Sequence, residues 1–328
     1  MKKKKLCFHI GYPKTGSTFL QKYYYPNFFF NLGKPYTTPK AENHKILDKI
    51  LYDIFKLNDE EFEKNINKLN DLASKILKFN NTKKLSVISL EGFTSLNNSA
   101  EYNLEKVKRL KKVFNCHDIK LEIFFFIRKQ EDIIRSNFLW SINHLSKINP
   151  NFICFNFFIN SIIKKNKKLS SYINNLDYNN FYKNLLKIFN KNEIKIFLFE
   201  ELTTDKENFF FKFSSIFNVR ITKNEVSKLI SKQEKYSSAN PMWVFYVFAY
   251  KNLASLVYRF KEYFFNLRLP NKLKTLYLFF KIIILSKLNK KYKISLNETK
   301  KKKINQMYKK KNIELLNKLN LDAKRYHY

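Results

Sequence analysis

Eight residues near the amino terminus, Gly11-Tyr12-Pro13-Lys14-Thr15-Gly16-Ser17-Thr18, have the types and spacing of an anion-binding loop. Backbone N–H groups in such a loop bind phosphate-like anions, because the N–H groups and the helix that follows both favour negative charge. The two glycines have the spacing of the nucleotide-triphosphate loop G-x-x-x-x-G-K-[ST], and Thr18 fits its last position. Ser17 stands at the lysine position, however, and the lysine lies inside the loop as Lys14. We therefore expect a phosphate-like anion that is bound without the usual lysine–Mg²⁺ arrangement of kinases.

The elements that must position this loop alternate along the first 220 residues. Short apolar runs predict strands, and segments with apolar spacing of three and four predict helices between them. This alternation predicts an α/β fold of the P-loop type, with a mostly parallel sheet flanked by helices. The predicted strands are Leu6–Ile10, Leu85–Leu90, Leu121–Ile127 and Ile194–Phe199, and the predicted helices start at about Ser17 or cover Asp59–Phe79, Leu104–Phe114, Gln130–Ile142 and Asn208–Phe217.

Three places follow directly on predicted strands and are therefore candidate ligand sites. Ligands of such sheets bind at the carboxyl ends of the strands. This rule selects Gly11–Ser17, Glu91 and Arg128. Beyond residue 220 the chain is helical in pattern and rich in lysine, without strand alternation. We expect one domain over residues 1–328, with an α/β core over about 1–220 and a helical C-terminal cover over about 221–328.

The loop closely resembles the 5′-phosphosulfate loop of sulfotransferases that use 3′-phosphoadenosine 5′-phosphosulfate (PAPS). A second motif of that family is a strand that ends in arginine, with a serine eight residues later on the next helix. Phe124-Phe125-Phe126-Ile127-Arg128 and Ser136 match it. The resemblance implies that PAPS is the donor and adenosine 3′,5′-bisphosphate the product. It also implies that Arg128 and Ser136 hold the 3′-phosphate, while the other end of the donor is bound by Lys14, Thr15, Gly16, Ser17 and Thr18.

Weaker matches extend the resemblance over most of the chain. Phe199-Glu200-Glu201-Leu202 is similar to an acidic strand end of the family, and Asn312–Tyr328 resembles the C-terminal helix and tail of bacterial glycan-type members. Gln233–Asn240 falls where such enzymes place a loop that covers the donor. The resemblance therefore implies a bacterial glycan-type sulfotransferase.

The acceptor must lose a proton as it attacks, so a positioned base is expected. In the glycan-modifying branch of the family this base is often a glutamate after the second strand, and Glu91 stands at that place. Two alternatives stay open. Glu91 is a structural partner of Lys14, or His9 in the first strand is the base. We expect His117 and His144 to be surface groups and Arg135 to be a solvated helix residue.

The composition of the chain indicates which kinds of ligand, metal and cross-link to expect. The chain has 63 Lys and Arg against 27 Asp and Glu, a formal net charge of +36. Because the lysines are spread along the whole chain, this charge favours a general attraction for anions over a nucleic-acid site. Three widely spaced cysteines without a C-x-x-C pair indicate neither disulfides nor zinc. We expect no metal in the site.

The apolar segments are too short to cross a membrane. Leu6–Ile10 is too short for a signal peptide. Trp243–Tyr250 and Thr275–Ser286 fall short of the roughly 20 residues that a bilayer requires. We therefore expect a cytoplasmic protein without a transmembrane segment, and contact with the inner membrane face stays open.

The sequence thus predicts an enzyme that transfers a sulfuryl group from PAPS to a hydroxyl or amine, with a glycan as the favoured acceptor and Glu91 as base. Lys14 would stabilise the departing 5′-phosphate. Two rival functions stay open. One is a nucleotide-dependent kinase on a related fold, which would require Mg²⁺. The other is a basic protein that binds polyanions without catalysis. The acceptor itself and the oligomeric state are left undecided.

Overall fold

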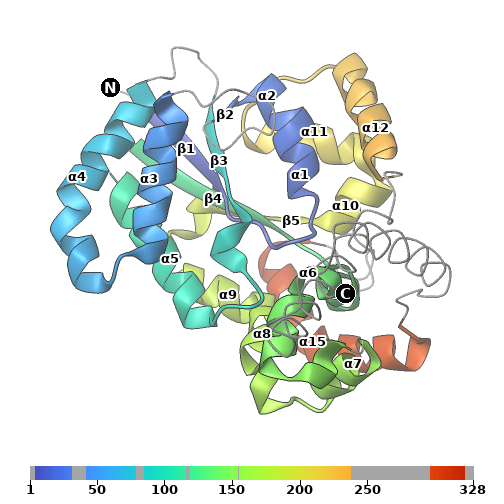
Figure 1. The fold of residues 1–328 in the computed structure, drawn as a ribbon. Helices are drawn as coiled ribbons and strands as arrows, with labels where there is room; N and C mark the ends of the chain where they lie inside the picture. Colours follow the sequence, from blue (N-terminus) through green and yellow to red (C-terminus); the bar gives the residue numbers. More distant parts are fainter. Residues whose placement is uncertain are drawn as a thin grey trace, which may run out of the picture.

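The computed structural model describes residues 4–31, 42–78, 85–115, 119–153, 155–237 and 296–321. Its centre is a five-stranded sheet in the order β2-β3-β1-β4-β5, in which every neighbouring pair is parallel. Helices cover the sheet on both sides (Figure 1). The predicted α/β fold is confirmed. The strands are β1 (Lys4–His9), β2 (Phe30–Asn31), β3 (Ser86–Ser89), β4 (Ile119–Ile127) and β5 (Ile194–Leu198).

The register of the three central strands brings the predicted ligand sites together. His9 at the end of β1 is opposite Ser89 of β3 on one side and Phe124 of β4 on the other. Backbone bonds continue beyond the strand, from Ile10 N to the Phe124 carbonyl at 3.0 Å and from Leu90 N to the His9 carbonyl at 2.9 Å. The segments that follow β1, β3 and β4 therefore leave the sheet at one edge.

The alternation of side chains along the strands divides the core in two. Leu6 and Phe8 point to one face of the sheet, whereas Cys7 points to the other. We call the first face the large core, because helices on that side contribute most of the buried aliphatic residues. We call the second face the aromatic core, whose rings are Phe19, Tyr24, Tyr25, Phe29, Phe124, Phe126, Phe197, Phe209, Phe210, Phe213 and Phe217.

The helices on the large core have local sequence reasons to form. In α4, three acids occupy the first turn and two lysines the last, which complements the helix dipole. In α5, the Ser99 side chain caps the helix by accepting a bond from Tyr102 N at 3.1 Å. The helices that bury residues in this core are α3 (Glu42–Lys56), α4 (Asp59–Lys78), α5 (Ala100–Phe114), α6 (Gln130–Ile148), α7 (Phe155–Ile163), α8 (Ser170–Asn175) and α9 (Tyr178–Leu185).

The helices on the aromatic core begin with the segment that follows the loop. This segment is α-helical in α1 (Ser17–Phe19), π-helical in η1 (Leu20–Tyr24) and again α-helical in α2 (Tyr25–Phe28). Figure 1 shows α1 and α2 beside α11 and α12 on this side of the sheet. The other elements here are α10 (Phe199–Thr204), α11 (Lys206–Ile216) and α12 (Lys223–Ser237).

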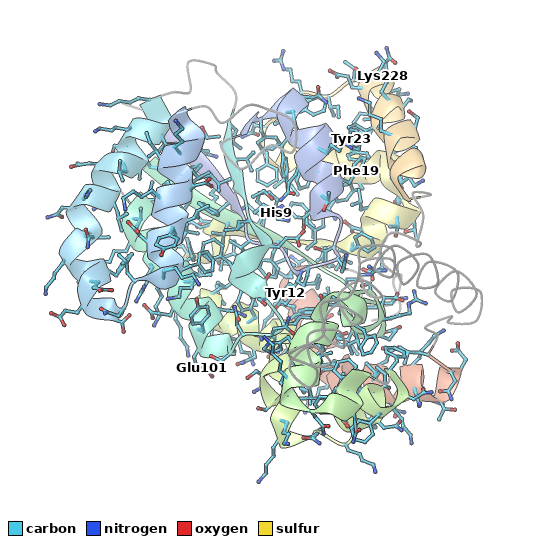
Figure 2. All side chains as sticks on the ribbon, in the orientation of Figure 1. His9, Tyr12, Phe19, Tyr23, Glu101 and Lys228 are labelled. Atoms are coloured by element: carbon cyan, nitrogen blue, oxygen red, sulfur yellow. The ribbon has the colours of Figure 1, made fainter. Side chains whose placement is uncertain are left out.

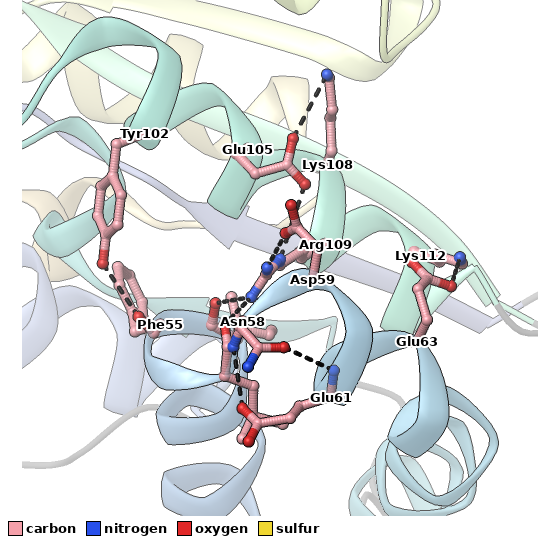
Figure 3. Close-up of polar contacts among 12 residues, drawn as sticks. Phe55, Asn58, Asp59, Glu61, Glu63, Tyr102, Glu105, Lys108, Arg109 and Lys112 are labelled. Carbon is pink, nitrogen blue, oxygen red and sulfur yellow. Dashed lines mark hydrogen bonds and ion pairs between the residues drawn. The ribbon is translucent and has the colours of Figure 1, made fainter.

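A polar cluster fastens α3 and α4 to α5 (Figure 3). The buried Arg109 guanidinium donates to the carbonyls of Ile54 at 3.3 Å and Leu57 at 2.7 Å, and it also bonds the Asp59 carboxylate. Tyr102 donates to the Phe55 carbonyl at 3.0 Å. These bonds satisfy carbonyls at the end of α3, which no helical N–H can reach.

The last described helix, α15 (Glu298–Lys318), packs on the large core through Ile304, Tyr308, Leu315 and Leu316. A buried pair of amides joins it to the first residue of α6. Gln130 donates to Asn312 Oδ1 and Asn312 donates to Gln130 Oε1, both at 3.0 Å. The two described helices beyond residue 220, α12 and α15, thus both contact the core.

Several boundaries differ from those predicted. The fourth strand ends at Leu198, because Phe199 starts α10, and α6 continues to Ile148 rather than ending at Ile142. Strand β2 was not predicted, and neither were α3, α7, α8, α9 and α10, whereas α12 falls in the region that was predicted to be helical. Gln233–Ser237 is the end of α12 rather than a loop, whereas residues 238–240 lie outside the described residues. So do the two apolar segments at 243–250 and 275–286. No helix of the described ranges is both long and apolar enough to cross a membrane.

Candidate active site

The loop between β1 and α1 takes a shape that needs glycine. Lys14 has a φ of 65° and Gly16 a φ of 84°, so both lie in the left-handed region. A Cβ on Gly16 would also lie 2.9 Å from Leu202 Cδ2. Backbone in which left-handed residues alternate with others directs successive N–H groups to one side and forms an anion-binding concavity. The loop therefore has the shape that its sequence predicts.

Hydroxyl groups hold the loop in this shape. Thr15 Oγ1 donates to the Tyr12 carbonyl at 2.6 Å. Thr94 Oγ1, from the segment after β3, lies 2.9 Å from the Ile10 carbonyl and 2.6 Å from the Gly11 carbonyl. Thr15 is buried and its hydroxyl is used inside the loop, so it has only its backbone N–H to offer a ligand. Ser17 is also buried, while Thr18 is half-buried.

Lys14 and Glu91 lie within electrostatic reach of each other. Burial lowers the pKa of Lys14 to about 8, while Glu91 opposes this shift and Arg128 adds to it. Burial also raises the pKa of Glu91, opposed by the Ser17 hydroxyl and by Lys14. The two roles considered for Glu91, base and partner of Lys14, therefore concern the same place beside the loop.

Arg128 connects the second motif to the loop. Its Nη1 donates to the Lys14 carbonyl at 2.8 Å and lies 3.5 Å from Ser136 Oγ. The guanidinium carbon lies 4.5 Å from the centre of the Phe199 ring, a cation–π distance. Although Lys14 and Arg128 are 114 positions apart in the sequence, the structure brings them together with Ser136.

The turn that carries Arg128 is held by residues from later elements. Tyr178 of α9 donates to the Arg128 carbonyl at 2.6 Å. Glu200 of α10 accepts a bond from Lys129 N at 2.9 Å. Both residues support the site, and sequence reasoning missed the role of Tyr178 entirely. Phe199 and Glu200 did stand out in the sequence, but as a strand end rather than as supports for Arg128.

The other histidine and arginine candidates that the structure describes are either exposed or fully buried. Arg135 is exposed and pairs with Asp132 at 3.0 Å, as a solvated helix residue would. His144 is exposed, and His117 lies outside the described residues. His9 is fully buried, and this burial lowers its pKa to about 3. Its ring is therefore neutral near pH 7.

The described residues form a cavity outside the site described above, and they contain no metal-binding group. The cavity, of about 280 Å³, lies between α7 and the start of α15, and none of its lining residues belongs to the site above. Within the described ranges, no group of three or more His, Cys, Asp or Glu side chains could hold a metal ion. Lys14 is close enough to both Arg128 and Glu91 for their charges to act on it.

No protein-family model matches the sequence, and no curated protein is significantly similar to it. Several solved structures align with the chain, among them three sulfotransferase structures of low identity. A sulfotransferase from Alicyclobacillus acidocaldarius is 14% identical over 69% of this chain and 89% of its own, with a TM-score of 0.39. The sulfotransferase domain of the Synechococcus PCC 7002 olefin synthase is 11% identical over 69% and 77%, with a TM-score of 0.35.

The third structure is mouse sulfotransferase SULT7A1 complexed with PAP, which is 13% identical over 70% of this chain and 64% of its own, with a TM-score of 0.35. At these scores the alignments carry no argument about function.

Proposed function

We propose that this protein transfers a sulfuryl group from PAPS to a hydroxyl or amine of an acceptor. The observation that carries the proposal is the contact between the two motifs, in which Arg128 donates to the Lys14 carbonyl and lies beside Ser136. A donor with phosphates at both the 5′ and 3′ positions requires two neighbouring anion sites. The loop offers the first site, and Arg128 with Ser136 offers the second.

The residues present fit such a donor. The loop N–H groups and Lys14 would hold the 5′ end, because a left-handed turn at a helix start presents N–H groups and positive charge together. One N–H of Arg128 donates to the Lys14 carbonyl. A guanidinium has five N–H donors, so others remain for a bidentate grip on the 3′-phosphate. Ser136 would add a hydroxyl donor.

Each residue then has one task in the reaction. The bound donor supplies a sulfuryl group whose bond to the 5′-phosphate oxygen breaks, with the electron pair staying on that oxygen. A new bond forms from sulfur to the acceptor oxygen or nitrogen. Glu91 receives the acceptor proton. Lys14 stabilises negative charge at the departing oxygen, as a preorganised cation does. Adenosine 3′,5′-bisphosphate leaves.

The surroundings of Glu91 favour it over His9 as the base. Burial raises the pKa of Glu91 above the ordinary carboxyl value and so brings it closer to neutral pH. The higher pKa makes the Glu91 carboxylate a stronger base. The Glu91 side chain is half-buried, so part of it is accessible. His9 is 0% exposed, and a group without exposed surface cannot touch an acceptor.

The finer parts of the proposal concern the acceptor and the location. We propose a glycan acceptor of the kind that bacterial glycan-type sulfotransferases modify, because Glu91 stands where those enzymes place a glutamate base. The net charge of +36 would attract an anionic donor or acceptor. A cytoplasmic location, with or without contact to the inner membrane face, belongs to the same proposal.

Donor binding gives the direct test. Adenosine 3′,5′-bisphosphate should raise the melting temperature far more than adenosine 5′-monophosphate, because a ligand that binds only the folded state stabilises it by mass action. Arg128→Ala should weaken the binding of adenosine 3′,5′-bisphosphate about 10- to 100-fold, the scale of one or two charge-assisted hydrogen bonds. The substitution should leave the affinity for adenosine 5′-monophosphate nearly unchanged.

Arg220→Ala is the matched control, because Arg220 is exposed in the segment between α11 and α12. Equal stabilisation of the wild type by both nucleotides would contradict the proposed role of Arg128 and Ser136. Turnover that is lost in a chelator and restored by Mg²⁺ would instead favour the kinase.

A further inference from the structure

The last described helix, α15, is bonded to both elements that hold Arg128, and the reaction proposed above does not involve it. The helix packs against α6, α7 and α9 (Figure 1). On α6 it is bonded to the first two residues, Gln130 and Glu131, which follow Arg128 by two and three positions. Asn312 exchanges two hydrogen bonds with Gln130, both at 3.0 Å, and Asn305 donates to Glu131 Oε1 at 3.2 Å.

The second of these elements is α9, which begins with Tyr178. Lys311 of α15 bonds the Asp177 carboxylate, and Asn179 donates to Glu314 Oε2 of α15 at 2.8 Å. Asp177 and Asn179 are both buried. Helix α15 therefore holds the residue on either side of Tyr178.

Gln130 joins the two elements directly. Its Nε2 donates to the Leu176 carbonyl at 3.2 Å as well as to Asn312 Oδ1. A primary amide has two N–H donors, so Gln130 uses both of them. Leu176 caps the end of α8 two residues before Tyr178. Because Asn312 bonds both the nitrogen and the oxygen of the Gln130 amide, it fixes the orientation in which this amide reaches Leu176.

Tyr178 contacts both motifs of the site. Its hydroxyl donates to the Arg128 carbonyl at 2.6 Å, and its ring lies edge-on to the ring of Tyr12 in the loop, with centroids 5.0 Å apart. Figure 2 shows Tyr12 in the interior of the molecule, between the sheet and the helices drawn below it. A shift of Tyr178 would therefore act on the backbone of Arg128.

We propose that α15 positions Arg128, a role that rests on the proposed function, in which Arg128 binds the 3′-phosphate. Asn312 acts through Gln130, both along the chain to Arg128 and across the bond to the Leu176 carbonyl. Lys311 acts through Asp177, next to Tyr178. Both are positioning residues, because they act on Arg128 through these neighbours.

The consequence concerns the geometry of the second anion site. A bidentate grip on phosphate depends on the direction of the N–H groups, and one N–H of Arg128 is already held by the Lys14 carbonyl. When the Asn312 amide is removed, the buried Gln130 amide loses one donor and one acceptor and must turn to replace them. The backbone of Arg128 then loses support, whereas the N–H groups of the loop keep theirs.

Asn312→Ala can be tested with two nucleotides that differ only at the 3′ position. Affinity for adenosine 3′,5′-bisphosphate should fall about 3- to 10-fold, the scale of one hydrogen bond. Affinity for adenosine 5′-monophosphate should stay within about twofold, since that nucleotide has no 3′-phosphate. Gln130→Ala should weaken the bisphosphate to a similar extent. Adding Asn312→Ala to Gln130→Ala should cause no further loss, because Asn312 acts through Gln130, and additive losses would contradict this.

Tyr308→Phe is the matched control. Tyr308 lies on the same helix, and its hydroxyl donates to the Ile173 carbonyl at 3.1 Å, so the substitution removes one buried hydrogen bond and leaves those of Gln130 in place. Both Asn312→Ala and Tyr308→Phe should lower the melting temperature, but only the first should weaken the bisphosphate. Equal losses of affinity would overturn the proposal, because any loosening of α15 would then explain them.

A milder variant carries the test if Asn312→Ala fails to fold. Lys311→Met breaks the ion pair with Asp177 and keeps an apolar side chain of similar length. Affinity for the bisphosphate should fall about two- to fivefold, the scale of a partly exposed ion pair. Unchanged affinity in this folded variant would overturn the proposal.

The mobility of the Arg128 side chain separates this proposal from the proposed function. Nuclear magnetic resonance relaxation of the Arg128 Nε–H needs no nucleotide, and Asn312→Ala should increase the motion of this group. If the wild type binds both nucleotides equally, the role of Arg128 in donor binding fails, and the relaxation measurement still decides whether Asn312 positions it. An Arg128 side chain as rigid in Asn312→Ala as in the wild type would overturn the positioning role.

Discussion

The loop between β1 and α1 and the turn between β4 and α6 both place a cation at the carboxyl edge of the sheet, but they are held in different ways. The loop depends largely on its own residues, although Thr94 and Arg128 also bond its carbonyls. Gly16 has a left-handed φ of 84°, and the Thr15 hydroxyl bonds the Tyr12 carbonyl. The turn depends on side chains from elsewhere. Tyr178 bonds the Arg128 carbonyl, and Glu200 bonds Lys129 N.

This difference predicts how each half of the site fails. A backbone-built loop is damaged when an atom is added, because its glycines leave no space. A turn built from side chains is damaged when a group is removed. In the proposed function, Lys14 of the loop and Glu91 beside it would act on the reacting atoms, while the turn would hold the far end of the donor. Changes near the loop should therefore affect turnover, and changes at the turn should affect binding.

Glu91→Gln should have the largest effect. The substitution keeps the shape of the side chain but cannot accept a proton, so turnover should fall by about 10²–10⁴-fold, the range for a positioned base. Donor affinity should hardly change. If Glu91 is instead only a partner of Lys14, stability and donor binding should fall together while the folded enzyme keeps most of its turnover. Measuring both on one purified variant separates the two roles.

Lys14→Ala should reduce turnover by about 10²–10³-fold, the scale for removing one preorganised donor at a developing negative charge. Product affinity should fall less, because the charge of Lys14 is most effective when negative charge builds on the leaving oxygen. The left-handed φ of Lys14 confounds the comparison, so Lys14→Asn, which tolerates that conformation, is a second variant. Intact turnover in both would restrict Lys14 to a role in the turn.

The pH profile of kcat/KM, which reports the pKa values of the free enzyme, should be bell-shaped. Glu91 must be charged to act, so activity should fall about tenfold per pH unit below its pKa, which burial raises above the ordinary carboxyl value. Lys14 must also be charged, so activity should fall again above about pH 8. In Glu91→Gln the acidic limb should disappear while the alkaline limb stays. An alkaline limb that survives in Lys14→Ala would assign it to another group.

Gly11→Ala should cause the smallest of these effects, and it should act on stability. The new Cβ would lie 2.5 Å from His9 Nε2, a ring fixed by its stack on Phe124. Overpacking of this kind costs about 1–3 kcal/mol. Gly92→Ala is the matched control, because its Cβ would meet Phe55 at an ordinary 3.4 Å. Equal melting temperatures for the two variants would show that the space at Gly11 is not limiting.

The helices and strands that were predicted differ from those that were not in their length and in the period of their apolar residues. The apolar run of β4 and the capped, amphipathic pattern of α4 were strong signals, and both elements were predicted. Strand β2 has two residues, too few for any period to appear. Helix α3 does bury Leu47, Ile50 and Ile54 at helical spacing, so its signal was present in the sequence and was overlooked. The helical pattern of α6 continues to Ile148, six residues beyond the predicted end at Ile142.

The candidate site shows the same division residue by residue. Gly11, Lys14 and Gly16 could be identified because a phosphate loop is a local motif, in which φ values and N–H directions depend on neighbouring residues. Arg128 and Ser136 could be identified from their spacing on one turn. Thr94, Tyr178 and the support of Arg128 by Phe199 could not, since each acts across a distance in sequence that only the packed chain closes.

The sequence by itself determined the α/β order of elements and the loop chemistry, because strand period, helix period and glycine conformations are local properties. The tertiary structure decided which groups meet. The sheet order places β1 between β3 and β4, and the register sets His9 opposite Ser89 and Phe124. That arrangement joins Arg128 to the Lys14 carbonyl and buries His9 behind the loop. Contacts of this kind depend on how strands pair, and pairing is fixed by the packing of the whole core rather than by any single segment.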